Sequence, residues 1–184
     1  MKPYRFALFA FLAVALVGVG GCSNNDSAKT EADVFLSINI PTGVADVNMA
    51  HSGDVVEPAM TITSHGKSPT AVLSQQDDVV LSEWVVTCTR TDGGSVASPV
   101  WHDFNQTTYV PAGGTASLVN YRIFPGDYFL QPPLNQLLCS GCLDKETNNP
   151  NIRQRLHIVI YGKTIAGKKV SLEFDVNLNF FYTP

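Results

Sequence analysis

Cysteines are the residues of this chain whose spacing most directly suggests chemistry. Cys139 and Cys142 form a CxxC pair, and such thiols exchange readily with disulfides when one has a lowered pKa at a helix N-terminus. No helical pattern follows Cys142, and Leu143 stands where a c-type haem site requires a histidine. We therefore expect a structural disulfide, with a thiol-disulfide redox role as the weaker alternative.

The disulfide pairing is open, because Cys88 is a third thiol. The candidates are Cys88–Cys139, Cys88–Cys142 and the local Cys139–Cys142 bond. Geometry favours a long-range bond, since Cys88 falls in a predicted strand and the CxxC pair in a loop that can fold over it. The three cysteines and one histidine would also satisfy the tetrahedral count of a zinc site, although only one of the two usual ligand pairs is visible.

A second group of candidate ligands consists of Met49, His51, Met60 and His65. Thioether and imidazole ligands suit copper in the periplasm. Their spacing does not match the Met/His motif of periplasmic copper chaperones, and a strand methionine more often belongs to the core. Copper or zinc binding is therefore an alternative function, and the main expectation includes no cofactor.

An aromatic-rich patch follows at Trp101, His102, Phe104 and Tyr109. Such a surface can bind sugar rings or a protein partner, whereas the simpler alternative is a strand edge that packs its rings inward. The chain has no nucleophile elbow, no HExxH motif and no phosphate-binding glycine loop. We expect a protein that is not an enzyme.

Alternation of apolar and polar residues predicts the strands that position these groups. The longest pattern covers residues 170–180, and residues 156–161 alternate in the same way, so the turn signal at 165–168 predicts an antiparallel hairpin. Further strands are expected at 34–40, 55–63 with Pro58 causing an early irregularity, 79–91, 109–110 and 116–124.

Residues 79–91 are apolar on both faces around Trp84, which is typical of a central strand between covering layers. Residues 125–153 break the regular spacing with Pro132-Pro133, a short helical turn at 134–138 and the CxxC pair. A loop of this length in a compact domain is usually functional or disordered. It is therefore one place to look for a site.

Seven strand-like segments without an amphipathic helix favour an all-β, antiparallel β-sandwich. Over residues 33–184 the pattern resembles immunoglobulin-like or fibronectin-III-like domains, with Trp84 in the place of the buried core tryptophan. The resemblance implies an immunoglobulin-like sandwich of about seven strands. The cysteines that flank the tryptophan strand in true immunoglobulin domains are absent at that spacing.

The N-terminus has the order of parts of a secretory signal. Lys2 and Arg5 precede an apolar run over 6–17, and small residues follow at 18–21. The run is shorter than the roughly 20 apolar residues of a membrane-spanning helix. Val19-Gly20-Gly21-Cys22 resembles the lipobox of bacterial lipoproteins, which implies cleavage before Cys22 by signal peptidase II, a diacylglycerol on its thiol and an acylated new N-terminus.

The lipobox resemblance divides the chain into a signal peptide at 1–21, a lipidated cysteine and flexible tether at 22–32, and one domain at 33–184. Ser23 replaces the aspartate that would signal inner-membrane retention in enterobacteria, so the outer membrane is favoured. Removing Lys2 and Arg5 leaves 10 basic against 16 acidic groups, a formal charge of −6. Lys168-Lys169 is the one cluster of basic residues in the sequence. We therefore expect no nucleic-acid partner, because binding to phosphates requires a larger basic patch.

These observations predict a lipid-anchored protein of the cell envelope that acts as a structural or accessory protein-binding module. Its expected partners are the lipid bilayer, through the acyl anchor, and an envelope protein. The contact is expected at edge strands or at the loop over 125–153. Metal binding and, more weakly, thiol-disulfide chemistry are the alternatives.

Overall fold

The computed structural model describes residues 31–184 except 42, 44, 45 and 52. The signal peptide, Cys22 and most of the expected tether lie outside the described residues and stay predictions. The fold begins slightly before the expected residue 33, because Ala32 is buried and its N–H donates to the carbonyl of Lys169 over 3.1 Å. Within the described part of the chain, no helix has the length and apolar character needed to cross a membrane.

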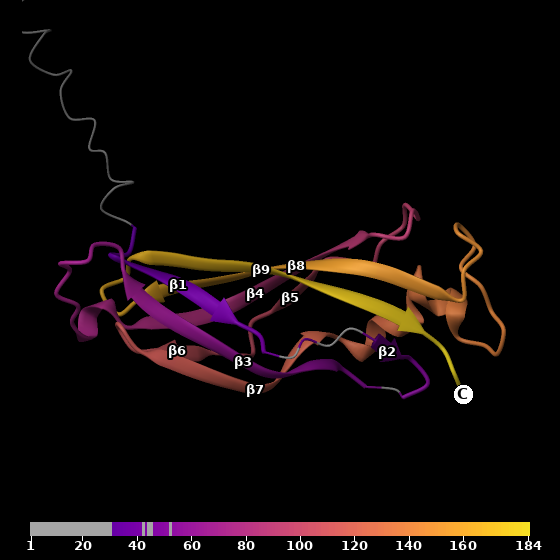
Figure 1. The fold of residues 1–184 in the computed structure, drawn as a ribbon, viewed down its shortest axis with the longest axis horizontal. Helices are drawn as coiled ribbons and strands as arrows, with labels where there is room; N and C mark the ends of the chain where they lie inside the picture. The colour runs from indigo at the N-terminus through magenta and orange to yellow at the C-terminus, as the bar shows by residue number, and fades with distance from the viewer. Residues whose placement is uncertain (1–30, 42, 44–45, 52) are drawn as a thin grey trace, which may run out of the picture. The chain divides into compact units, whose positions relative to one another are not determined.

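The described residues form nine strands and three short 3₁₀ turns (Figure 1). The strands are β1 (Val34–Asn39), β2 (Asp46–Asn48), β3 (Val55–Gly66), β4 (Val79–Arg90), β5 (Trp101–Asp103), β6 (Thr108–Val110), β7 (Thr115–Phe124), β8 (Asn151–Thr164) and β9 (Lys169–Phe181). The turns are η1 (Gln75–Asp77), η2 (Gly126–Leu130) and η3 (Leu134–Leu137). All seven expected strands are present, and β2 and β5 are additional.

Two sheets form the predicted all-β sandwich. The smaller sheet has the order β1-β3-β7 and is antiparallel throughout. The larger sheet has the order β2-β9-β8-β4-β5, and β6 also pairs with β4. Its strands are antiparallel except for β2, which runs parallel to β9. The fold class is therefore confirmed, while the immunoglobulin-like type within it stays a prediction.

The β8–β9 hairpin is the longest pairing of the fold, with a register that runs from Asn151–Phe181 to Lys163–Lys169. Gly167 in its turn has a φ of +82°, a conformation that favours glycine. β3 has an early irregularity as expected, but it is a register shift between Val55 and Val56 and lies before Pro58. The alternating pattern thus predicted both the hairpin and its turn.

Trp84 joins the two sheets at the centre of the core. Its side chain is fully buried, stacks on Tyr121 of β7 with ring centroids 4.0 Å apart, and meets the edge of Phe174 of β9 at 6.3 Å. The expectation of covering layers on both faces of β4 is wrong: Val80 and Val85, on the opposite face from Trp84, are part-exposed. Apolar β-branched residues suit a half-open sheet face as well as a buried one, so the pattern could not tell the two apart.

The loop over 125–150 is ordered by η2, η3 and a disulfide. The helical turn expected at 134–138 is the 3₁₀ turn η3, with Leu134 and Leu137 buried against the core. Cys139 and Cys142 form the disulfide, with their Cα atoms 5.2 Å apart. The preference for a long-range bond is wrong, because Cys88 points into the core from β4 and is a free, buried thiol.

Candidate functional site

The expected copper ligands do not come together. Met49 and Met60 are core residues, 3% and 1% exposed, while His51 and His65 are exposed. Met60 and His65 lie on opposite faces of β3, and their Cα atoms are five residue steps apart along the strand, about 16 Å. The His65 ring instead contacts the hydroxyl of Ser37 at 2.8 Å and stacks on Phe35.

The cysteines do not form a metal site either. The thiols of Cys139 and Cys142 are joined in a disulfide, and burial raises the pKa of the Cys88 thiol to about 12. Among the residues described, no group of three or more His, Cys, Asp and Glu side chains is arranged to hold a metal ion. The donor groups present therefore do not fit the zinc or copper sites that the sequence suggested.

The expected aromatic patch is divided by the fold. Trp101 is buried, and the guanidinium of Arg122 lies 5.1 Å from its ring centroid. His102 and Tyr109 are exposed and stand opposite Val85 and Val80 of β4, on the face of the larger sheet that points away from the core. Their surface is available for contact, whereas Trp101 packs inward as the simpler alternative predicted.

A buried ion cluster fastens the loop over 125–150 to the sandwich. Arg90, at the end of β4, donates to both carboxylate oxygens of Asp92, at 2.7 and 2.9 Å, and to Asp144 at 2.9 Å. Asp144 also accepts bonds from the N–H and hydroxyl of Thr147. We call Arg90, Asp92 and Asp144 the Arg90 cluster. No sequence pattern marks it, because Arg90 and Asp144 are far apart in the chain.

Hydrogen bonding dominates the electrostatics of the Arg90 cluster. Burial alone would raise the pKa of Asp92 and of Asp144, but the bonds from Arg90 and from neighbouring N–H groups outweigh it and hold both pKa values below the ordinary 3.8. Both groups are therefore ionised in the folded protein at neutral pH. The charges of the cluster are paired with one another, while one buried carboxylate oxygen of Asp144 has no hydrogen-bond partner among the described residues. The cluster works as a structural tie.

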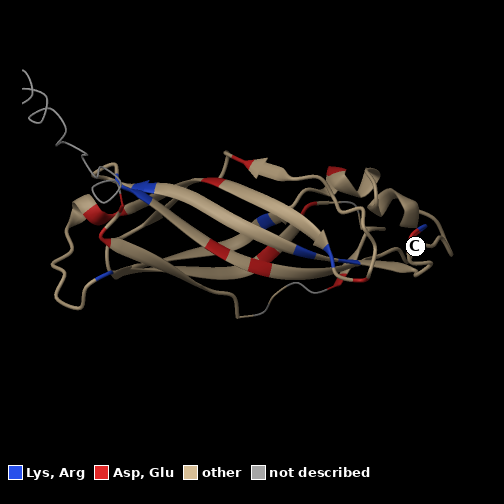
Figure 2. Cartoon of the chain, turned by 90° about the horizontal axis from the view of Figure 1, so that it is seen from above, with Lys and Arg blue, Asp and Glu red and all other residues tan. Residues whose placement is uncertain are grey.

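A second ion cluster joins the two sheets. Arg122 of β7 donates to Asp103 of β5 at 3.0 Å and to Asp54 at 3.3 Å. Asp103 is buried and also accepts a bond from Gln106 at 2.6 Å. We call Arg122, Asp103 and Asp54 the Arg122 cluster. Charged residues elsewhere are spread along strands and loops with both signs mixed (Figure 2).

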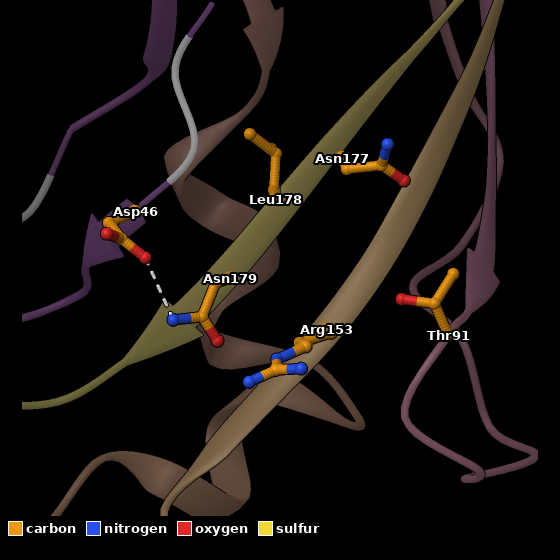
Figure 3. Close-up of a pocket in the computed structure, with 6 residues that line it drawn as sticks. All are labelled: Asp46, Thr91, Arg153, Asn177, Leu178 and Asn179. Carbon is orange, nitrogen blue, oxygen red and sulfur yellow. Dashed lines mark hydrogen bonds between the residues drawn. The ribbon is translucent and has the colours of Figure 1, made fainter.

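A polar hollow of about 340 Å³ opens on the outer face of the larger sheet. Four neighbouring segments line it (Figure 3): Asp46 of β2, Thr91 just after β4, Arg153 of β8, and Asn177, Leu178 and Asn179 of β9. The Asn179 carboxamide donates to Asp46 over 2.9 Å and accepts from Asn151 over 2.6 Å. These bonds hold one wall of the hollow in a single orientation.

The Arg90 cluster supports the floor of this hollow. Asp92 accepts a bond from the backbone N–H of Arg153 over 2.8 Å, and the N–H of Thr91 donates to the carbonyl of Arg153 over 3.0 Å. These bonds therefore hold the backbone of Thr91 and Arg153, two of the residues that line the hollow, in place. Sequence reasoning missed this hollow, because its residues come from four separate segments and form no motif.

The open edge of β7 is a different kind of surface. β7 is the outer strand of the smaller sheet. The N–H of Ser64 donates to the carbonyl of Gly114 over 2.9 Å, so alternate pairs such as Ile62–Ala116 carry the ladder hydrogen bonds. The N–H and C=O groups of Thr115, Ser117 and Val119 therefore point away from β3.

The regular stretch of β7 runs from Thr115 to Val119, because Asn120 has a left-handed φ of +52° that interrupts the strand geometry. Residues 115–121 carry no charge and no proline, and Val119 is 71% exposed. Natural sheets usually protect an edge with lysine, proline or a bulge. The first five residues of β7 thus form an unprotected edge that we call the β7 edge, residues 115–119.

Neither a known protein-family model nor a curated protein sequence matches this chain.

Proposed function

We propose that this chain is a lipid-anchored cell-envelope protein, held on the outer membrane through Cys22, whose β-sandwich serves as a structural or accessory protein-binding module. The observation that carries the binding role is the β7 edge. Its outward N–H and C=O groups lie on a strand without charge or proline, which favours addition of a partner strand.

Strand addition fits the chemistry of this edge. Each main-chain hydrogen bond to a partner contributes about 1 kcal/mol, and the side chain of Val119 offers an apolar contact on the outer face. The partner we propose is an extended, uncharged segment of another envelope protein. Acyl chains contribute about 0.8 kcal/mol per buried CH₂, so two or three of them would concentrate the module at the membrane where such a partner resides.

Photocrosslinking in intact cells tests the binding role. A photoreactive residue at Ser117 is expected to give a defined adduct with one envelope protein, and Val119→Lys is expected to abolish that adduct. Leu130→Lys is the matched control, because Leu130 is 72% exposed, as apolar as Val119 and away from the edge. The proposal fails if no adduct forms at Ser117 or if both lysine variants affect it equally.

Palmitate labelling tests the anchor separately. The full chain is expected to incorporate labelled palmitate and to fractionate with membranes, and Cys22→Ser is expected to lose both properties. An inhibitor of signal peptidase II should leave the precursor uncleaved. Unlabelled protein with unchanged gel mobility would overturn the anchor without bearing on the β7 edge.

A further inference from the structure

The polar hollow contains side chains that the fold itself does not use. Among the described residues, no hydrogen bond or ion pair joins the Arg153 guanidinium, the Asn177 carboxamide or the Thr91 hydroxyl to another side chain. Asp46 and Asn179, by contrast, are bonded to each other. The hollow therefore combines a fixed wall with donors and acceptors that a ligand can engage.

The charge around the hollow favours an anion. Arg155 lies two residues from Arg153 on the same face of β8 and pairs in register with Asn177. Its guanidinium is likewise exposed, and no ion pair within the described residues neutralises it. Arg153 and Arg155 thus lie without ion-pair partners on this face, where the neighbouring carboxylates are Asp46, bonded to Asn179, and Asp175, paired with His157.

The free side chains of the hollow indicate which ligand groups each of them can bind. A guanidinium binds a planar carboxylate through two parallel hydrogen bonds. Carboxamides and hydroxyls donate and accept at once, as the hydroxyl groups of a sugar require. Because the hollow is open and about 340 Å³ in volume, near the lower limit for ligand pockets, it has room for one sugar-sized ring of a ligand.

We propose that this hollow binds an anionic sugar, with a carboxylate held by Arg153 and ring hydroxyls held by Asn177 and Thr91. The backbone of the floor is already ordered by Asp92 and the Thr91–Arg153 bond, so binding has to order only the side chains that contact the sugar. The hollow is on the larger sheet and the β7 edge on the smaller one. This inference is independent of the proposed protein contact.

Calorimetric titration of the full chain, purified in a mild detergent, tests the inference with trigalacturonate as the probe. Trigalacturonate is expected to bind, and neutral galactotriose to bind at least about tenfold more weakly. Arg153→Gln is expected to raise the dissociation constant for trigalacturonate by about tenfold or more. Asn177→Ala is expected to raise it by about threefold to tenfold. Both side chains are exposed, so both variants should keep the wild-type unfolding midpoint.

Lys163→Gln is the matched control. Lys163 is on the same strand and the same face as Arg153, about 33 Å away, and its substitution removes the same charge. Its effect should stay within about twofold, since screening weakens charges at that distance. Equal effects of Lys163→Gln and Arg153→Gln would overturn the site in favour of diffuse attraction.

Two further ligands separate the possible sources of affinity. Acetate binding as tightly as trigalacturonate would reduce the hollow to a simple anion site and overturn the sugar assignment. Galactose 6-phosphate binding more tightly than trigalacturonate would overturn the carboxylate assignment in favour of a phosphorylated sugar. Absence of trigalacturonate binding at millimolar concentration would overturn the whole inference.

Discussion

The two arginine clusters perform similar work in different surroundings. The side chain of Arg90 is 1% exposed and that of Asp144 is fully buried, so the pair is removed from water. The side chain of Arg122 is 32% exposed, and one of its two partners, Asp54, is 43% exposed. The first cluster holds a long loop against the sandwich, and the second joins the two sheets. The comparison indicates that burial, rather than the number of ion pairs, decides how much each cluster matters.

Removing a partner from the buried cluster should have the largest effect. Asp144→Ala leaves the guanidinium of Arg90 buried with one partner fewer, and we expect the free energy of unfolding to fall by about 3–5 kcal/mol. Urea unfolding followed by tryptophan fluorescence measures it. Asp175→Asn is the control, because Asp175 is exposed and bonded only to His157 among the described residues. Equal losses in the two variants would refute the role of burial.

Breaking the half-exposed cluster should have a smaller effect. Arg122→Met keeps packing against Trp101, and Asp103 keeps its bonds from Gln106 and from the N–H of Asn105. We therefore expect a loss of about 1–2 kcal/mol by the same unfolding measurement. A loss as large as that of Asp144→Ala would show that the two clusters are equivalent.

Acid should weaken both clusters. The folded-state pKa values of Asp92, Asp144 and Asp103 lie below 3.8, because bonds to arginines and N–H groups outweigh the effect of burial. Their stabilisation is complete above that pH and is lost as the pH falls through the folded values. Asp144→Ala should flatten the dependence of stability on pH between 2 and 4, by at most about 1.4 kcal/mol per pH unit. An unchanged slope would contradict the lowered pKa of Asp144.

The smallest expected effect is on the reactivity of Cys88, which reports local opening near the Arg90 cluster because it lies two residues before Arg90 on β4. Burial raises the pKa of its thiol to about 12, so a thiol reagent at pH 8 should label the folded protein slowly. Labelling should accelerate more in Asp144→Ala than in Arg122→Met, since opening of the Arg90 end exposes the thiol. Mass spectrometry of the labelled peptide measures this, and identical rates in the two variants would argue against local opening.

Several elements could be predicted because their cause is local. The hairpin at β8 and β9 follows from alternation over many residues, and Gly167 marks its turn. β2 and β5 escaped prediction because three residues are too few to show a period. The preference for a long-range disulfide was wrong, because the direction in which Cys88 points depends on which face of β4 meets the other sheet.

The candidate sites differ from the strands in this respect, because they depend on contacts between distant segments rather than on local pattern. The pattern of apolar residues along the chain was enough to specify strands and an all-β class, since period-two burial is a property of each segment alone. The Arg90 cluster, the hollow beside Arg153 and the open β7 edge depend on strand order, and strand order arises from packing between segments distant in sequence. Side chains meet there because sheets pair across the whole domain, so only the folded arrangement could reveal them.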